Sequence, residues 1–207
     1  MLIPPQRKPN PPTEPQEAQC VDELASAVLR VSQGLEWPCV IAIDGRSGSG
    51  KTTLAVNLAH RIGAAIITGD DFYIGGTELR NDSPGSRMAK CIDWVDQRSV
   101  LQSLRTGNQA TWHAFDWATF DGRETGEPRM LRATQYIILE GVYSARPELQ
   151  DLIDIRILFE IPPYLRKDRL IRREGQLGPW EAQWQEAEDH YFGTIVHREE
   201  FDFIFNG

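Results

Sequence analysis

The stretch from Gly45 to Thr52 reads Gly-Arg-Ser-Gly-Ser-Gly-Lys-Thr and fits G-x-x-x-x-G-K-[ST], the pattern of a phosphate-binding loop. Its glycines let backbone N–H groups approach phosphate oxygens, because no Cβ stands in the way. Lys51 would reach the β- and γ-phosphates, and the Thr52 hydroxyl would bind a magnesium ion. We therefore predict a nucleoside triphosphate site formed by Gly45, Ser47, Gly48, Ser49, Gly50, Lys51, Thr52 and Thr53.

The residues on either side of this loop predict the elements that the chemistry needs. An apolar run at residues 39–43 predicts a buried strand before the loop. Leu54, Leu58 and Ile62 recur at helical spacing after it, and the positive end of that helix dipole would face the phosphates. The alternative, a glycine-rich turn with a solvated lysine, does not require a strand before the loop and a helix after it.

The remaining pattern alternates strands with helices, which predicts a parallel sheet whose ligands bind at the carboxyl ends of the strands. Residues 1–16 are rich in proline and predict a flexible segment, followed by a single domain over 17–207. Residues 74–93 predict a long mobile loop. Further strands are predicted at 64–68, 111–116, 136–140, 153–161 and 201–205, and helices at 17–33, 95–105, 163–173 and 180–192.

Composition limits the partners and the compartment. The 207 residues carry a net charge of −8, which disfavours binding to the backbones of nucleic acids. The three cysteines show no C-x-x-C spacing, and no apolar run reaches the length of a membrane span. We expect a cytoplasmic protein with no nucleic-acid or membrane partner, and the sequence leaves both a monomer and a homo-oligomer open.

Three carboxylates, Asp70, Asp93 and Glu140, follow or end predicted elements. Parallel strands open onto one crevice at their carboxyl ends, so acids at those ends are expected to meet there. Asp70 is the candidate general base that accepts a hydroxyl proton, and Glu140 is the candidate acid near magnesium. Asp71 is expected to bind backbone or solvent.

The helix predicted after Pro163 carries five basic residues, of which Arg166, Arg169 and Arg173 share one face. These side chains are expected to form a lid that stabilises charge on the transferred phosphoryl group. Asp168 can pair with Arg172 four residues on, so part of the cluster can serve the helix alone.

Most of the other polar and aromatic residues suit structural roles. The acidic residues at 181, 186, 188 and 189 are expected to form a solvated helix surface, and Trp180 and Trp184 to pack onto the core or lid. Trp117 and Phe120 belong to an aromatic group that either packs or stacks on a flat substrate ring. No N-K-x-D guanine signature occurs, which favours ATP over GTP.

The order of these motifs resembles the uridine kinase-like proteins. The matching residues are the loop, Asp70-Asp71-Phe72-Tyr73, Asp93, Phe115-Asp116-Trp117, Glu140-Gly141 and Arg169-Leu170-Ile171-Arg172-Arg173. The resemblance spans about residues 38–205 and implies a three-layer α/β P-loop kinase fold, with a five-stranded, mostly parallel sheet and a short arginine-bearing lid. It implies ATP and Mg²⁺ as cofactors and a small-molecule hydroxyl acceptor as the partner.

Site roles follow from the same resemblance. Catalytic roles are implied for Asp70, Lys51, Arg169 and Arg173, and magnesium would lie near Thr52, Asp70 and Glu140. Arg172 and Arg173 would lie nearer ATP. The acceptor would contact Tyr73, Asp93, Phe115, Trp117, Phe120 and Arg169.

The chain departs from this family pattern in the acceptor region. Phe120 stands where uridine kinases have a histidine that reads the pyrimidine, and Ile92 stands where they have an aromatic residue. A pocket without that hydrogen-bonding group should prefer a different acceptor. We predict a kinase for a nucleoside or a similar metabolite. Pantothenate, a sugar or nicotinamide riboside as acceptor, and a non-catalytic nucleotide-binding regulator, remain open alternatives.

Overall fold

The computed structural model describes residues 14–34 and 38–207, and its central element is a six-stranded sheet. The strands run in the order β1 (Gln16–Ala18), β8 (Phe203–Asn206), β7 (Ile155–Glu160), β2 (Cys39–Asp44), β6 (Tyr136–Glu140) and β3 (Ala64–Thr68). Every pairing in this sheet is parallel. The predicted α/β architecture is therefore confirmed, with one strand more than expected.

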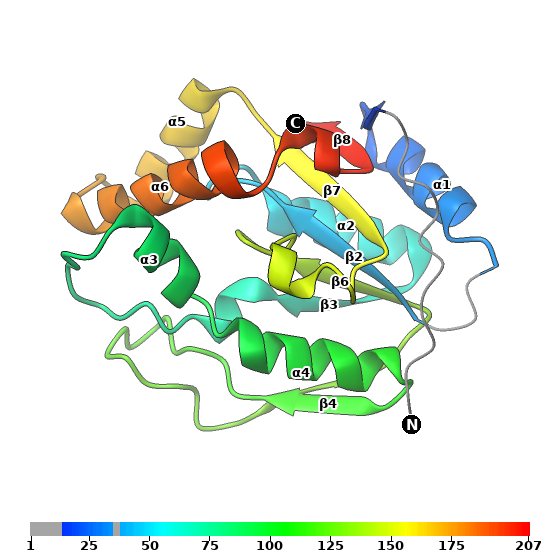
Figure 1. Ribbon diagram of the computed structural model, residues 1–207, viewed down its shortest axis with the longest axis horizontal. Helices are drawn as coiled ribbons and strands as arrows, with labels where there is room; N and C mark the ends of the chain where they lie inside the picture. The colour runs from blue at the N-terminus through cyan, green and yellow to red at the C-terminus, as the bar shows by residue number, and fades with distance from the viewer. Residues whose placement is uncertain (1–13, 35–37) are drawn as a thin grey trace.

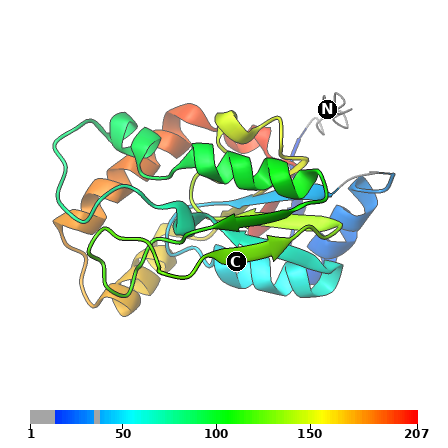
Figure 2. The same cartoon turned by 90° about the horizontal axis from the view of Figure 1, so that it is seen from below.

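Helices cover both faces of the sheet and make three layers (Figures 1 and 2). One face carries α1 (Val21–Val31) and α2 (Lys51–Ile62), and α4 (Trp94–Arg105) lies on the opposite side. Side chains of β2 alternate between two cores: Cys39, Ile41 and Ile43 pack with α1 and α2, while Val40 and Ala42 pack on the α4 side. All six residues of β2 are buried, as expected for a central strand covered on both faces.

The sixth strand, β1, explains the difference from the predicted sheet. Its three residues pair in parallel with Phe203–Phe205 of β8, close to the other end of the chain. Residues 1–13 of the predicted flexible segment 1–16 lie outside the described residues. Gln16, the last residue of that segment, belongs to this strand. A strand this short offers too few residues for a period-2 pattern, so only its pairing reveals it.

Residues 109–132 form a separate antiparallel hairpin of β4 (Gln109–Trp112) and β5 (Arg129–Arg132). The strand predicted at 111–116 is therefore shifted and does not join the main sheet. Its residues 113–116 lie in the segment after β4, where Phe115 forms an isolated bridge with Glu124.

The predicted loop at 74–93 contains a short helix, α3 (Pro84–Lys90). Ser83 caps it by accepting a hydrogen bond from the Ser86 amide, and Pro84 occupies the first turn, where its missing N–H costs nothing. Arg87 of α3 pairs with Glu186 of α6 (Pro179–His190), and the two helices pack together. The segment is therefore anchored to α6.

The helix α5 (Pro163–Glu174) follows β7 and leads through a short connection into α6 (Figure 1). Two short helices, η1 (Gly69–Phe72) and the π-helical η3 (Tyr191–Ile195), follow β3 and α6 respectively. The remaining short turns are η2 (Pro147–Leu149) and η4 (Arg198–Glu200). In the part of the chain that the structure describes, no helix has both the length and the apolar character needed to span a membrane.

Candidate active site

The phosphate loop connects β2 to α2, as the sequence predicts. Gly50 caps α2 in the left-handed region, at φ 105°, which disfavours any residue with a Cβ. At Gly45 a Cβ would lie 2.5 Å from the Phe159 carbonyl oxygen of β7, so the loop can pass this strand only with glycine. The backbone N–H groups at the start of α2 therefore open toward the end of the sheet.

One large cavity, of about 1020 Å³, lies at the carboxyl ends of β2, β6 and β3. Six residues of the predicted nucleotide site line it: Ser47, Gly48, Gly50, Lys51, Thr52 and Thr53. The other two, Gly45 and Ser49, line a second cavity of about 960 Å³ on the β7 and β8 side of the loop. The loop thus forms part of the wall of both cavities.

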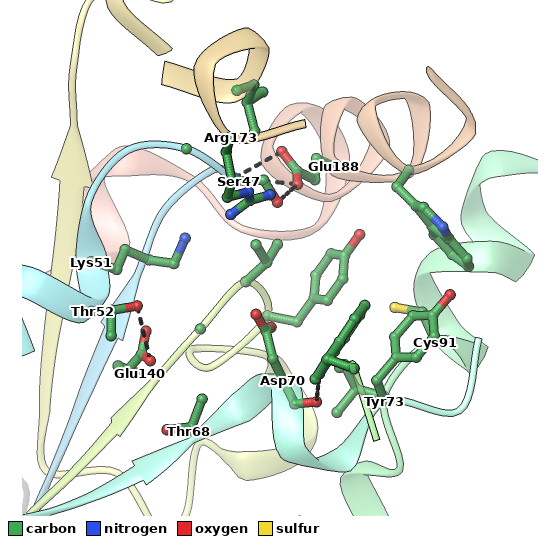
Figure 3. Close-up of a pocket in the computed structure, with 18 of the residues that line it drawn as sticks. Ser47, Lys51, Thr52, Thr68, Asp70, Tyr73, Cys91, Glu140, Arg173 and Glu188 are labelled. Carbon is green, nitrogen blue, oxygen red and sulfur yellow. Dashed lines mark hydrogen bonds between the residues drawn. The ribbon is translucent and has the colours of Figure 1, made fainter. Parts of the chain in front are cut away.

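Lys51 and Thr52 occupy the left wall of the main cavity in Figure 3. The Lys51 ammonium donates to the Arg46 carbonyl oxygen at 3.0 Å, so the lysine folds back over the loop in this state. The Thr52 hydroxyl donates to Glu140 Oε1 at 3.2 Å. The Thr52 hydroxyl and the Glu140 carboxylate are therefore adjacent. Two oxygen ligands of one cation would also lie next to each other in this way.

Glu140 ends β6 and is only 2% exposed. Burial, together with the neighbouring Asp70, raises the pKa of its carboxyl to about 7, against the lowering effects of Lys51 and Thr52. A cation beside this group would favour its ionised form. Among the described residues no three His, Cys, Asp or Glu are grouped to hold a metal ion, so a magnesium ion here would also need phosphate oxygens and water.

Asp70 lies in η1, directly after β3, and its side chain is exposed at the cavity. Thr68 of β3 is in register with Glu140 of β6, so the two strand ends meet. A Cβ on Gly69 would lie 2.9 Å from the Glu140 carbonyl oxygen, which allows η1 to approach β6 closely. The predicted meeting of strand-end acids therefore holds for Asp70 and Glu140.

Asp71 differs from its neighbour and from the prediction that it binds backbone or solvent. Its buried carboxylate accepts a hydrogen bond from Trp112 Nε1 at 2.8 Å and pairs with Arg129 Nε at 3.2 Å. Burial raises the pKa of this carboxyl, while Trp112 and Arg129 lower it. Asp71 therefore joins the β4–β5 hairpin to η1, and Arg129 itself lines the main cavity.

Asp93 caps α4 in this structure. Its carboxylate accepts from the backbone N–H groups of Val95 and Asp96 at 3.1 and 3.0 Å, and it does not line the cavity. Its neighbours Cys91 and Ile92 do line it. The structure thus accounts for Asp93 as a helix cap, and the contact with the acceptor that the resemblance implies for it stays a prediction.

Aromatic side chains line one wall of the cavity. Tyr73, Trp117 and Phe120 line it as predicted, whereas Phe115 is buried behind them, 5.0 Å from Tyr73 and 4.7 Å from Trp117 between ring centroids. Trp180 and Trp184 of α6 complete this wall, and their indole N–H groups have no hydrogen-bond partner among the described residues. Helical spacing alone placed these two on the core or lid and did not show that they face the cavity.

The arginines of α5 divide between two faces. Arg169 donates to the Ser49 carbonyl oxygen of the loop, and Arg173 lines the main cavity. Arg172 instead pairs with Asp168 at 2.6 Å, is 77% exposed and does not line the cavity. The predicted i, i+4 pair is confirmed, and the structure does not bring Arg172 to the place that the resemblance implies.

Glu188 is the site residue that sequence reasoning missed. The expected solvated acidic surface holds for Glu186 and Asp189, but Glu188 is buried and its carboxylate contacts Ser47 of the phosphate loop (Figure 3). Glu181 also lines the cavity and caps α6 by accepting from the Gly178 amide at 2.7 Å. Glu188 lies four residues after Trp184 and eight after Trp180, so helical spacing places it on the face of these two tryptophans, and that spacing was the available signal.

Comparison with known proteins agrees with this geometry. No family model matches the chain. A uridine kinase from Ureaplasma parvum is 27% identical over 154 residues, which cover 66% of this chain and 67% of that protein. A solved structure of a possible uridine kinase from Bacillus stearothermophilus matches 89% of this chain and 96% of its own, with a TM-score of 0.67 and 22% identity.

A kinase assigned to a fructose transport system in Silicibacter sp. TM1040 matches 90% of this chain and 99% of its own, with a TM-score of 0.68 and 20% identity. The chain is uridine kinase-like and has the P-loop kinase fold. In this uridine kinase-like chain, the phosphate loop, Asp70 of η1 and Glu140 of β6 lie at the carboxyl ends of the parallel strands, the edge at which open α/β sheets bind ligands. The wall formed by the aromatic residues lies across the same cavity.

Proposed function

We propose that this protein is an ATP- and magnesium-dependent kinase that transfers the γ-phosphoryl group to a hydroxyl of a nucleoside or nucleoside-like metabolite. One observation carries the proposal: a single cavity is lined by the phosphate-binding residues Lys51 and Thr52 and by the exposed carboxylate of Asp70. A donor and an acceptor bound in this cavity would both contact its walls. Phosphoryl transfer depends mainly on such positioning and on charge neutralisation.

The metal would be held by Thr52 and Glu140, with Asp70 close by. The adjacent hydroxyl and carboxylate support this assignment, as does the raised pKa of Glu140, which a cation would offset. Magnesium would supply positive charge to the β- and γ-phosphate oxygens. Lys51, Arg169 and Arg173 would add charge from the loop and from α5.

In the proposed reaction Asp70 accepts the proton of the acceptor hydroxyl. The hydroxyl oxygen forms a bond to the γ-phosphorus, and the bond from that phosphorus to the bridging oxygen breaks, which releases ADP. Asp70 is exposed at the cavity and forms no ion pair with any described residue, so its carboxylate is available to the acceptor.

The acceptor class rests on the aromatic wall. This wall, formed by Tyr73, Trp117, Phe120, Trp180 and Trp184, offers ring faces and edges to a flat ring. A sugar or pantothenate offers no flat ring to such a wall. The proposed compartment is the cytoplasm, which agrees with the three free cysteines, Cys20, Cys39 and Cys91.

An ADP-release assay across a panel of acceptors tests the proposal. The purified full-length protein would be incubated with Mg·ATP and, in separate reactions, nucleosides, nicotinamide riboside, pantothenate and simple sugars, with Lys51→Ala as the inactive control. We expect acceptor-dependent ADP with at least one nucleoside-like compound. ADP release with sugars or pantothenate alone would contradict the acceptor class. Nucleotide binding without ADP release over the whole panel would favour the non-catalytic regulator.

A further inference from the structure

Glu188 of α6 brings a carboxylate against the phosphate loop. The carboxylate accepts a hydrogen bond from the Ser47 hydroxyl, and both of its oxygens lie 3.2 Å from the Ser47 backbone nitrogen. Its side chain is 4% exposed, and Arg166 of α5 lies 3.7 Å away. The group is thus a buried anion that is bound by two donors of Ser47, as Figure 3 shows, and that also lies near one arginine.

This set of partners is chemically an anion site. Successive N–H groups of a phosphate loop form a concave surface that binds phosphate oxygens, and arginine supports the same charge. Ser47 also lines the cavity in which the nucleotide is proposed to bind. A carboxylate oxygen and a phosphate oxygen would make the same contacts with the Ser47 N–H and hydroxyl, so the two compete for them.

We propose that the Glu188 carboxylate occupies the Ser47 donors of the phosphate loop in the nucleotide-free protein. It thereby lowers the affinity of the protein for nucleotide. When a triphosphate binds, its oxygens would take over these donors and repel the buried carboxylate, which must leave Ser47. The inference rests on the proposed function, because it requires a nucleotide phosphate to reach the loop.

The position of Glu188 on α6 gives its displacement a second consequence. The same helix carries Trp180 and Trp184 of the acceptor wall, and it is tied to the loop a second time by the pair of Arg46 with Asp189. A shift of α6 that takes Glu188 away from Ser47 would therefore also move the acceptor wall. Nucleotide binding would in this way be linked to the shape of the acceptor pocket.

Two substitutions separate the charge of Glu188 from its shape. Glu188→Gln keeps the size of the side chain but removes the charge that opposes phosphate, and Glu188→Ala removes the competing group. We expect both variants to bind Mg·ATP about tenfold more tightly than the wild type, because a contact to a charged group no longer has to be broken. Isothermal titration of the full-length protein measures these dissociation constants.

Glu186→Gln is the matched control. Glu186 lies on the same helix and changes the net charge equally, but it pairs with Arg87 of α3 and does not contact the loop. We expect its affinity for Mg·ATP to equal that of the wild type. A purely structural role of Glu188 would lower the affinity when the residue is changed, so the sign of the effect distinguishes competition from support.

The outcomes also separate this inference from the proposed function. If the wild type binds Mg·ATP and neither Glu188 variant binds it more tightly, the inference is wrong and the proposed donor site stands. If the wild type does not bind Mg·ATP, both are wrong. Should Glu188→Ala fail to fold in a thermal unfolding control, the isosteric Glu188→Gln decides the question by the same criterion.

Discussion

At the scale of single residues, Asp70 and Asp71 show how environment assigns different roles to identical side chains. Asp70 is exposed at the cavity, whereas Asp71 is 4% exposed and bound by Trp112 and Arg129. The turn of η1 after β3 points the two carboxylates in different directions. Asp70 is therefore open to the cavity, whereas Asp71 holds the hairpin against η1.

The substitution Asp70→Asn tests this division. The asparagine keeps the shape of the side chain but cannot accept the hydroxyl proton, so we expect turnover to fall by about 10²–10⁴-fold while ATP binding stays nearly intact. Steady-state ADP release and a nucleotide titration measure the two effects. Wild-type turnover in this variant, on the acceptor found in the screen, would show that Asp70 is not the base.

At the scale of elements, α5 presents its arginines on two faces. Its first turns contact the loop, where Arg166 lies near Ser47 and Arg169 binds the Ser49 carbonyl oxygen. Arg172 lies one step around the helix and points to solvent with Asp168. Because residues three and seven apart share a face, a run of arginines on one helix cannot all reach the same ligand.

We expect Arg169→Ala to lower kcat/KM by about 10²-fold, because a preorganised cationic donor next to the phosphate loop is lost. Arg172→Ala should leave kcat/KM close to the wild-type value, since only an exposed pair with Asp168 is lost. Steady-state kinetics with varied ATP compares the two variants. An equal loss in both would favour the position that the family resemblance implies for Arg172.

At the scale of the whole molecule, the sheet and its two helical layers hold the strand ends of the site at fixed positions. A buried ion pair contributes to this arrangement: Arg105 at the end of α4 binds both oxygens of Asp154 at 2.7 and 2.8 Å, just before β7. Asp154 also accepts from the Val40 amide of β2 at 2.8 Å. One carboxylate thus ties α4, β7 and the strand before the phosphate loop together.

Replacing Arg105 with methionine leaves Asp154 buried without its cation, and we expect the free energy of unfolding to fall by about 3–5 kcal/mol. Arg98→Met is the matched control, because Arg98 of the same helix pairs with Asp151 at 2.5 Å in a more exposed setting. That variant should lose about 0–1 kcal/mol. Urea unfolding, followed by circular dichroism, measures the free energy of unfolding of both variants. Equal losses would show that the burial of the Arg105–Asp154 pair does not set its contribution.

The sequence by itself determined the features that depend on neighbours in the chain. The loop from Gly45 to Thr52, its strand and its helix follow from local pattern, and so do Asp70 and Glu140 at the ends of β3 and β6. Parallel pairing then brings those ends together, which could be predicted without knowing any contact. The fold class and the position of the proposed donor side were therefore accessible from the amino acids alone.

The tertiary structure decided which face of each element meets a distant segment of the chain. It buried Glu188 against Ser47, turned Trp180 and Trp184 into the cavity, made Asp93 a helix cap and left Arg172 at the surface. It also added β1, whose three residues are a strand only because β8 lies beside them. Helical spacing groups side chains on one face, but only the packing of that helix against the rest of the molecule decides whether the face meets a ligand, a neighbour or water.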